Sequence, residues 1–126
     1  MGLRIYLVDD DLLLRDLYRR FFVRAGYSVV GEGQAGPRLL EDVKRAAPDV
    51  VLLDLEMPGG SGCGYIQSFR DLGAEVIVLS GSAVRGWRTE ALELGAAAAL
   101  EKLDGLHQID VAIRRATGWG GFHLRE

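Results

Sequence analysis

Three aspartates in this chain stand at the ends of short apolar segments, where carboxylates from different segments could share a cation. Asp9 and Asp10 follow LRIYLV, and Asp54 ends DVVLLD. If folding brings these carboxylates together, their mutual repulsion calls for a bound proton or a divalent cation. Mg²⁺ is the simplest occupant, because it prefers oxygen ligands and can also bind a phosphate oxygen. Mn²⁺ accepts a similar set of donors.

A serine and a lysine occupy comparable positions after two later segments. Ser80 ends EVIVLS, and Lys102 follows the Ala-rich stretch at 97–101. A carboxylate can act as the nucleophile of phosphoryl transfer, which then depends mostly on positioning and charge neutralisation. The hydroxyl of Ser80 and the ammonium of Lys102 could contact the oxygens of the transferred group. Each residue alone is common after a strand, but the set predicts an aspartyl-phosphate site.

Apolar segments alternate with helical patterns along the chain, which indicates how these residues are positioned. Strands are expected at 3–8, 27–31, 49–54, 75–80 and 97–101. Asp11 is a plausible N-cap for the first helix. Five helices are expected. Four are marked by apolar residues at helical spacing: Leu14, Leu17, Phe21 and Ala25 in the first; Leu40, Val43 and Ala47 in the second; Ile66, Phe69 and Leu72 in the third; and Leu106, Ile109, Ile113 and Ala116 in the fifth. The fourth helix is expected at about 86–94.

This alternation predicts an α/β protein with a flavodoxin-like (βα)5 three-layer sandwich. The parallel five-stranded sheet is expected in the order 2-1-3-4-5. The first and third strands are neighbours in this order, and the carboxyl ends of parallel strands meet at one edge. Asp9, Asp10 and Asp54 should therefore converge there.

Composition limits the classes of protein to which the chain can belong. Its 126 residues are 48% hydrophobic and 26% charged, which is typical of one globular domain. The net charge of −3 offers no basic surface for direct nucleic acid binding. A lone cysteine, Cys63, and the lack of a signal or membrane-spanning pattern lead us to expect a cytoplasmic protein. Residues 1–117 are expected to form the domain, and 118–126 a C-terminal tail or the start of a linker.

Four motifs carry a family resemblance that extends to about Thr117. They are LVDDD at 7–11, LLDLEMPGGSG at 52–62, VIVLSG at 76–81 and GAAAALEK at 95–102. With these motifs the chain resembles the receiver domain of response regulators in two-component signalling systems. The resemblance implies Mg-dependent transfer of a phosphoryl group to Asp54 from a histidine kinase or phosphotransfer protein. It also implies a domain that is not an enzyme beyond its own phosphorylation and dephosphorylation, and that switches the binding of a partner.

The resemblance assigns roles to individual residues. Asp9 and Asp10 form the acid pair that holds the metal with Asp54 and the backbone carbonyl of Glu56. Ser80 is the switch hydroxyl, and Lys102 contacts the phosphoryl group. Three residues correspond to positions that modulate hydrolysis of the phosphoaspartate, namely Glu56, Gly81 and Ser82. Family members also dimerise through the fourth helix, fifth strand and fifth helix; the downstream effector is not indicated.

Two residues depart from the family pattern. Ala99 stands where family members carry the rotating switch aromatic, and Leu103 stands where proline usually follows the lysine. These departures leave the phosphorylation chemistry intact. They predict that coupling from Ser80 to the surface of the fourth helix, fifth strand and fifth helix is weakened or takes another route.

Two alternative functions would explain part of the sequence pattern. The first is a receiver-like interaction module that is not phosphorylated in its cell, which Ala99 alone favours. The second is a dinucleotide-binding fold, because Gly31, Gly33 and Gly36 form a G-x-G-x-x-G motif between a strand and a helix. Against the second, the motif follows the second strand, and Pro37 removes an amide that would face a pyrophosphate. Trp87 is interpreted as a packing residue of the fourth helix.

Overall fold

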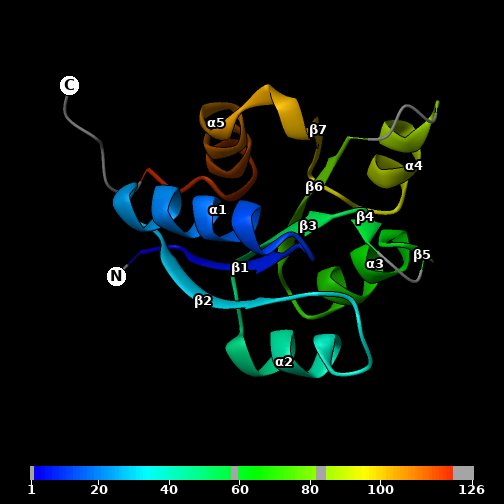
Figure 1. The fold of residues 1–126 in the computed structure, drawn as a ribbon, viewed down its shortest axis with the longest axis horizontal. Helices are drawn as coiled ribbons and strands as arrows, with labels where there is room; N and C mark the ends of the chain where they lie inside the picture. The colour runs from blue at the N-terminus through cyan, green and yellow to red at the C-terminus, as the bar shows by residue number, and fades with distance from the viewer. Residues whose placement is uncertain (1, 58–59, 82–84, 121–126) are drawn as a thin grey trace.

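A five-stranded parallel sheet lies at the centre of the computed structural model, which describes residues 2–57, 60–81 and 85–120 (Figure 1). Its strands are β1 (Arg4–Val8), β2 (Ser28–Gly33), β3 (Val50–Asp54), β6 (Glu75–Ser80) and β7 (Ala98–Glu101). Their spatial order is β2-β1-β3-β6-β7, with every neighbouring pair parallel. This confirms the predicted flavodoxin-like order 2-1-3-4-5.

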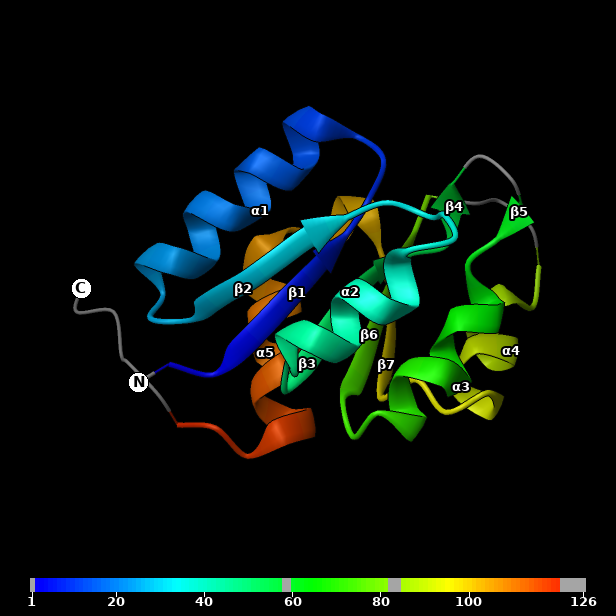
Figure 2. The ribbon, with the colours of Figure 1, turned by 90° about the horizontal axis from the view of Figure 1, so that it is seen from below.

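Helices cover both faces of the sheet. They are α1 (Leu12–Arg24), α2 (Leu39–Ala46), α3 (Cys63–Asp71), α4 (Trp87–Glu93) and α5 (Leu106–Thr117), with a short 3-10 helix η1 (Lys102–Asp104). α1 and α5 pack on one face, and α2, α3 and α4 on the other (Figures 1 and 2). Successive residues of each strand point to opposite faces, so the central strands are apolar throughout.

The buried faces of the helices differ in detail from the sequence pattern. Asp11 is the N-cap of α1 as predicted, and its carboxylate accepts from the amides of Leu13 and Leu14 at 3.0 and 3.1 Å. Leu17, predicted to face the core, is 49% exposed, because the larger rings of Tyr18 and Phe22 take the inward positions. Similar corrections apply to Leu40 and Leu72, which are 40% and 37% exposed.

Those two corrections have local causes. Leu39 and Val43 form the buried stripe of α2, so its neighbour Leu40 points outward. Leu72 lies beyond the last residue of α3, at its C-cap, where the helix leaves the sheet. Trp87, at the start of α4, packs against the core on that face, as predicted.

The G-x-G-x-x-G motif is explained by packing around Tyr6. β2 extends to Gly33, beyond the predicted end at residue 31, and lies beside β1 at the edge of the sheet. A Cβ atom at Gly31 would lie 2.3 Å from the Tyr6 ring, and one at Gly33 would lie 3.2 Å from its hydroxyl. These two glycines therefore make room for a core tyrosine, which accounts for them without a dinucleotide.

Gly31→Ala is expected to lower the free energy of unfolding by about 1–3 kcal/mol, because the new methyl group must displace the Tyr6 ring. Urea denaturation of the two proteins measures the difference. Gly36→Ala is the matched control, since no heavy atom outside its chain neighbours lies within 4 Å of the added methyl. Equal losses in both variants would contradict the packing explanation.

Trp119, near the end of the described chain, packs against the segment between α1 and β2 and against α5. Trp119 meets the ring of Tyr27 edge to face at 4.6 Å, and the guanidinium of Arg114 lies 4.8 Å from the centroid of its ring. The domain boundary at Thr117 stays a prediction. Within the described ranges, no helix has both the length and the apolar character that crossing a bilayer demands.

Candidate functional site

Asp9, Asp10 and Asp54 lie together at the carboxyl edge of the sheet. β1 and β3 pair in register up to Val8 and Leu53, so the residues that follow stand side by side. Each of the three aspartates offers a carboxylate oxygen within 4.8 Å of the others. Asp9 and Asp54 are 2% and 1% exposed. The strand order therefore produces the carboxylate cluster that the sequence predicted, in a geometry that could hold a metal ion.

Each buried aspartate uses one carboxylate oxygen to fix the turn after its own strand. Asp9 Oδ1 accepts from the amide of Asp11 at 2.9 Å, and Asp54 Oδ1 accepts from the amide of Glu56 at 2.9 Å. Neither Oδ2 atom has a hydrogen-bond partner in the described part of the chain apart from the nearby ammonium of Lys102. These two oxygens are thus held in place on the side of each carboxylate that faces the Lys102 ammonium.

Lys102 brings one positive charge to this cluster. Its Nζ lies 3.0 Å from Asp54 Oδ2 and 3.7 Å from Asp9 Oδ2. The residue begins η1, directly after β7, and the η1 turn is closed by a hydrogen bond of 3.0 Å from the amide of Glu101 to Asp104. One ammonium cannot neutralise three carboxylates, so a divalent cation would complete the charge balance.

Burial is the largest influence on the pKa values of Asp9 and Asp54. It raises the pKa of Asp54 from 3.8 to about 6, although the hydrogen bonds from Glu56 and Lys102 oppose the rise. Burial likewise raises the pKa of Asp9. For Lys102 burial acts to lower the pKa, but the contacts with Asp54 and Asp9 outweigh it and raise the value. The site therefore favours a positive charge among its carboxylates.

The raised pKa of Asp54 predicts a pH-dependent stability in the absence of metal. The folded protein binds a proton at Asp54 more tightly than the unfolded chain, so this contribution is complete below about pH 4 and disappears as the pH rises through about 6. Between pH 5.5 and 7.5 in EDTA, we expect wild type to lose about 1 kcal/mol of unfolding free energy relative to Asp54→Asn. Urea denaturation of both proteins measures this difference, and a parallel pH profile would contradict it.

The other predicted residues lie around the same edge. Ser80 ends β6 beside Glu101 and is 1% exposed, and Gly81 follows it. The predicted set thus occupies the ends of β1, β3, β6 and β7. Ser82 lies outside the described residues. The roles assigned to this set, including a metal-binding carbonyl at Glu56, stay predictions.

The side chain of Glu56 makes a contact that the sequence did not predict. Glu56 belongs to a short antiparallel pair, β4 (Glu56–Met57) with β5 (Gly60–Ser61), where only a Gly-rich loop was expected. Its carboxylate accepts a hydrogen bond from the Gly81 amide. This contact joins the loops that follow β3 and β6, and no spacing rule in the sequence could reveal it.

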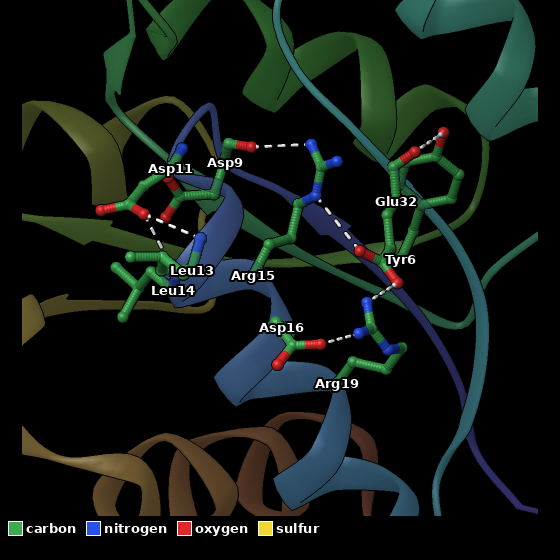
Figure 3. A network of polar contacts seen from close by, with 9 residues as sticks. All are labelled: Tyr6, Asp9, Asp11, Leu13, Leu14, Arg15, Asp16, Arg19 and Glu32. Carbon is green, nitrogen blue, oxygen red and sulfur yellow. Dashed lines mark hydrogen bonds and ion pairs between the residues drawn. The ribbon is translucent and has the colours of Figure 1, made fainter.

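A charged network beside the acid pair was also missed. Arg15, one turn into α1, donates to the backbone carbonyl of Asp9 at 2.9 Å (Figure 3). Glu32 of β2 accepts from Arg15 Nε at 3.2 Å and from Arg19 at 2.7 Å. Arginines on a helix usually belong to a solvated face, so the sequence alone gave no reason to select them.

Ala99 lies in β7 opposite Val78, on the face covered by α4. Ala99 and Trp87 both pack against the core on this face. The strand therefore carries no aromatic at this position, and Trp87 of α4 is one of several rings that pack on this face.

The family model described as "Response regulator receiver domain" matches residues 5–114. The chain belongs to the response regulator receiver family. Among curated relatives, the receiver domain is 34% identical over 98 residues to the chemotaxis protein CheY of Thermotoga maritima, covering 76% of this chain and 82% of that protein. It is 31% identical to the transcriptional regulatory protein DesR of Bacillus subtilis, covering 84% of this chain but 53% of DesR.

Solved structures agree with the fold of this receiver domain. The signal receiver domain of the response regulator NarL from Mycobacterium tuberculosis superposes with a TM-score of 0.80 and 32% identity, covering 94% of this chain and 98% of that one. The receiver domain thus spans most of CheY but about half of DesR. Such a domain acts in two-component signalling, and this chain covers different shares of the lengths of its relatives.

Proposed function

We propose that this receiver domain accepts a phosphoryl group on Asp54 in a Mg²⁺-dependent reaction and thereby switches the binding of a partner. One observation carries the proposal. The Oδ2 atoms of Asp9 and Asp54 are buried, fixed by backbone amides through their Oδ1 atoms, and face the Lys102 ammonium. This arrangement supports a carboxylate nucleophile beside a cation site.

The side chains divide the reaction between them. The Asp54 carboxylate attacks the phosphorus of a phosphohistidine on a histidine kinase or phosphotransfer protein. An O–P bond forms, and the N–P bond breaks with its electron pair passing to the histidine nitrogen, which takes a proton from solvent and leaves as neutral imidazole. Lys102 neutralises charge on the transferred oxygens, and Ser80 donates its hydroxyl to one of them. Asp9, Asp10, Asp54 and the Glu56 carbonyl would hold Mg²⁺, or Mn²⁺ in its place, which would further neutralise the phosphoryl charge.

Incubation with acetyl phosphate and MgCl₂, followed by intact-mass measurement, tests this function. We expect a gain of one phosphoryl group that requires Mg²⁺ and disappears in EDTA. An unmodified mass under all conditions would favour the alternative, a receiver-like interaction module that is not phosphorylated. The domain acts on no other substrate in this proposal, which limits its catalysis to its own phosphorylation and dephosphorylation.

Modulation of phosphoaspartate lifetime is proposed for Glu56, Gly81 and Ser82. Gly81 presents no side chain, which leaves water access to the site open, while the Glu56 carboxylate already accepts from the Gly81 amide.

The cytoplasm is the proposed compartment, because the domain must meet a kinase supplied with ATP. The effector is proposed to be a protein surface, since a net charge of −3 does not favour nucleic acid.

We also propose that phosphorylation acts through the surface of α4, β7 and α5, including a homodimer on this face. A shallow groove of about 330 Å³ runs between β7 and α5, and four of its eight lining residues are alanines, which allow close approach of a second copy. Sedimentation velocity with and without beryllofluoride tests the dimer. A monomer in both conditions at high concentration would contradict it.

Ala99 bears on how the signal reaches that face. Without a switch aromatic in β7, coupling from Ser80 is proposed to be weakened or to pass through another group. Amide shifts measured with and without beryllofluoride test this, and a full response in α4, β7 and α5 would refute it.

A further inference from the structure

A guanidinium from α1 holds the backbone between the two acidic residues at the end of β1. The carbonyl of Asp9, which belongs to the peptide that joins Asp9 to Asp10, accepts from Arg15 Nη1 at 2.9 Å. The Arg15 side chain is only 16% exposed. Figure 3 shows it lying between the acidic turn and Glu32. This contact is made to the main chain and not to a carboxylate.

Glu32 holds Arg15 in that position from the neighbouring strand. Its carboxylate binds Arg15 at 3.2 Å and Arg19 at 2.7 Å, and Arg19 also pairs with Asp16. Glu32 lies in β2, which is parallel to β1 and paired with it through Leu7. The four residues Arg15, Asp16, Arg19 and Glu32, here called the α1–β2 clasp, thus connect the acidic turn to the rigid sheet.

The acid pair is restrained at three backbone or carboxylate atoms of Asp9. Its amide donates to the carbonyl of Gly33 at 3.0 Å, its Oδ1 accepts from Asp11, and its carbonyl accepts from Arg15. Asp10 follows this carbonyl directly and is the least buried of the three candidate ligands. The direction of the Asp10 residue therefore depends on how firmly the Asp9–Asp10 peptide is held.

The charge of Arg15 alone does not explain why its guanidinium lies beside the proposed metal site. A positive group near a divalent cation site opposes metal binding through repulsion. Glu32 neutralises the Arg15 guanidinium, so the clasp can orient the peptide with little net charge of its own.

From these contacts we infer that Arg15, oriented by Glu32, is a positioning residue that presents Asp9 and Asp10 to the metal. The inference rests on the proposed Mg²⁺-dependent function and adds to it a residue outside the ligand set. It predicts the direction in which Mg²⁺ affinity changes when Arg15 is replaced. Removal of the Arg15 charge would tighten Mg²⁺ binding if electrostatics dominated, whereas loss of positioning weakens it.

Titration of MgCl₂ into the full chain, followed by isothermal calorimetry, measures this effect in four variants. We expect Arg15→Gln to weaken Mg²⁺ binding by about tenfold and Glu32→Gln to weaken it less. Arg15→Lys should bind Mg²⁺ more tightly than Arg15→Gln, because its one charged nitrogen can still donate to the Asp9 carbonyl. Arg20→Gln is the matched control, because this side chain lies on the same helix, is 76% exposed and pairs only with Asp16 among the described residues. The control should bind Mg²⁺ as tightly as wild type or slightly more tightly.

A second readout separates positioning from a general loss of structure. Phosphorylation by acetyl phosphate is measured over a range of Mg²⁺ concentrations, with thermal melting in EDTA as a check of folding. Arg15→Gln should need more Mg²⁺ for half-maximal rate but reach a similar maximal rate. Affinity equal to or tighter than wild type in Arg15→Gln, or equal weakening in Arg20→Gln, would overturn the inference. If wild type binds no Mg²⁺, the proposed function fails and this inference fails with it.

Discussion

Asp54→Asn should abolish phosphoryl transfer to the receiver domain. The amide nitrogen and oxygen of asparagine are poor nucleophiles, and Asp54 is the buried carboxylate nearest to Lys102, at 3.0 Å. Asparagine has nearly the same shape, so its remaining oxygen can still accept from the Glu56 amide and the fold should persist. Intact mass after incubation with acetyl phosphate and MgCl₂ should show no phosphoryl adduct.

Asp71→Asn provides the control for that experiment. Asp71 ends α3 and is exposed, far from the carboxyl edge of β1 and β3 in the topology. The Asp71→Asn variant keeps Asp54 and should therefore gain a phosphoryl group as rapidly as wild type. A phosphoryl adduct on Asp54→Asn would show that another residue accepts the group and would contradict the assignment of Asp54.

Lys102→Met should have the largest effect on stability. In the absence of metal it leaves the buried carboxylates of Asp9 and Asp54 without a cation, and breaking a buried ion pair in this way typically removes about 3–5 kcal/mol. Because Lys102 itself is 22% exposed, water can reach the site, and we expect about 2–3 kcal/mol at pH 7.5. Urea denaturation in EDTA measures the loss, and phosphorylation should slow as well.

Two rescue experiments test the cause of that loss. Addition of Mg²⁺ should restore part of the stability, because a cation again lies among the carboxylates. The double variant Lys102→Met with Asp54→Asn should also recover, since one negative charge is gone. Lys44→Met, at an exposed position of α2, is the control and should change stability little. A deficit in Lys102→Met that neither rescue reduces would indicate lost packing instead.

We expect the chemistry of the proposed site and the transmission of its signal to be separable. The carboxylates, Ser80 and Lys102 lie at strand ends, whereas Ala99 stands in β7 where the family resemblance implies a switch aromatic. Trp87 of α4 packs against the same face of the core as Ala99. The proposed phosphorylation is therefore expected to persist while its effect on α4, β7 and α5 differs from that in family members with the aromatic.

Local patterns in the amino-acid sequence predicted the order of the elements and the edge of the sheet at which the candidate site lies. Five apolar segments, alternating with helical patterns, allow few parallel topologies, and residues that follow such strands must meet at one edge. That reasoning predicted Asp9, Asp10, Asp54, Ser80 and Lys102 at strand ends along one edge of the sheet, where the structure has them, because it depends only on where each strand ends; their roles stay predictions. Local signals also predicted the Asp11 N-cap, since its partners are two and three residues away.

Tertiary structure decided the features that depend on contacts between distant segments. Tyr18 rather than Leu17 faces the sheet because the ring fills space set by other strands. Gly31 makes room for the Tyr6 ring, 25 residues earlier, and the Arg15 guanidinium, which donates to the Asp9 carbonyl, also binds Glu32 of β2. Local patterns record periodicity and turn chemistry but not which side chains meet across the fold, so these contacts appear only when the strands are assembled.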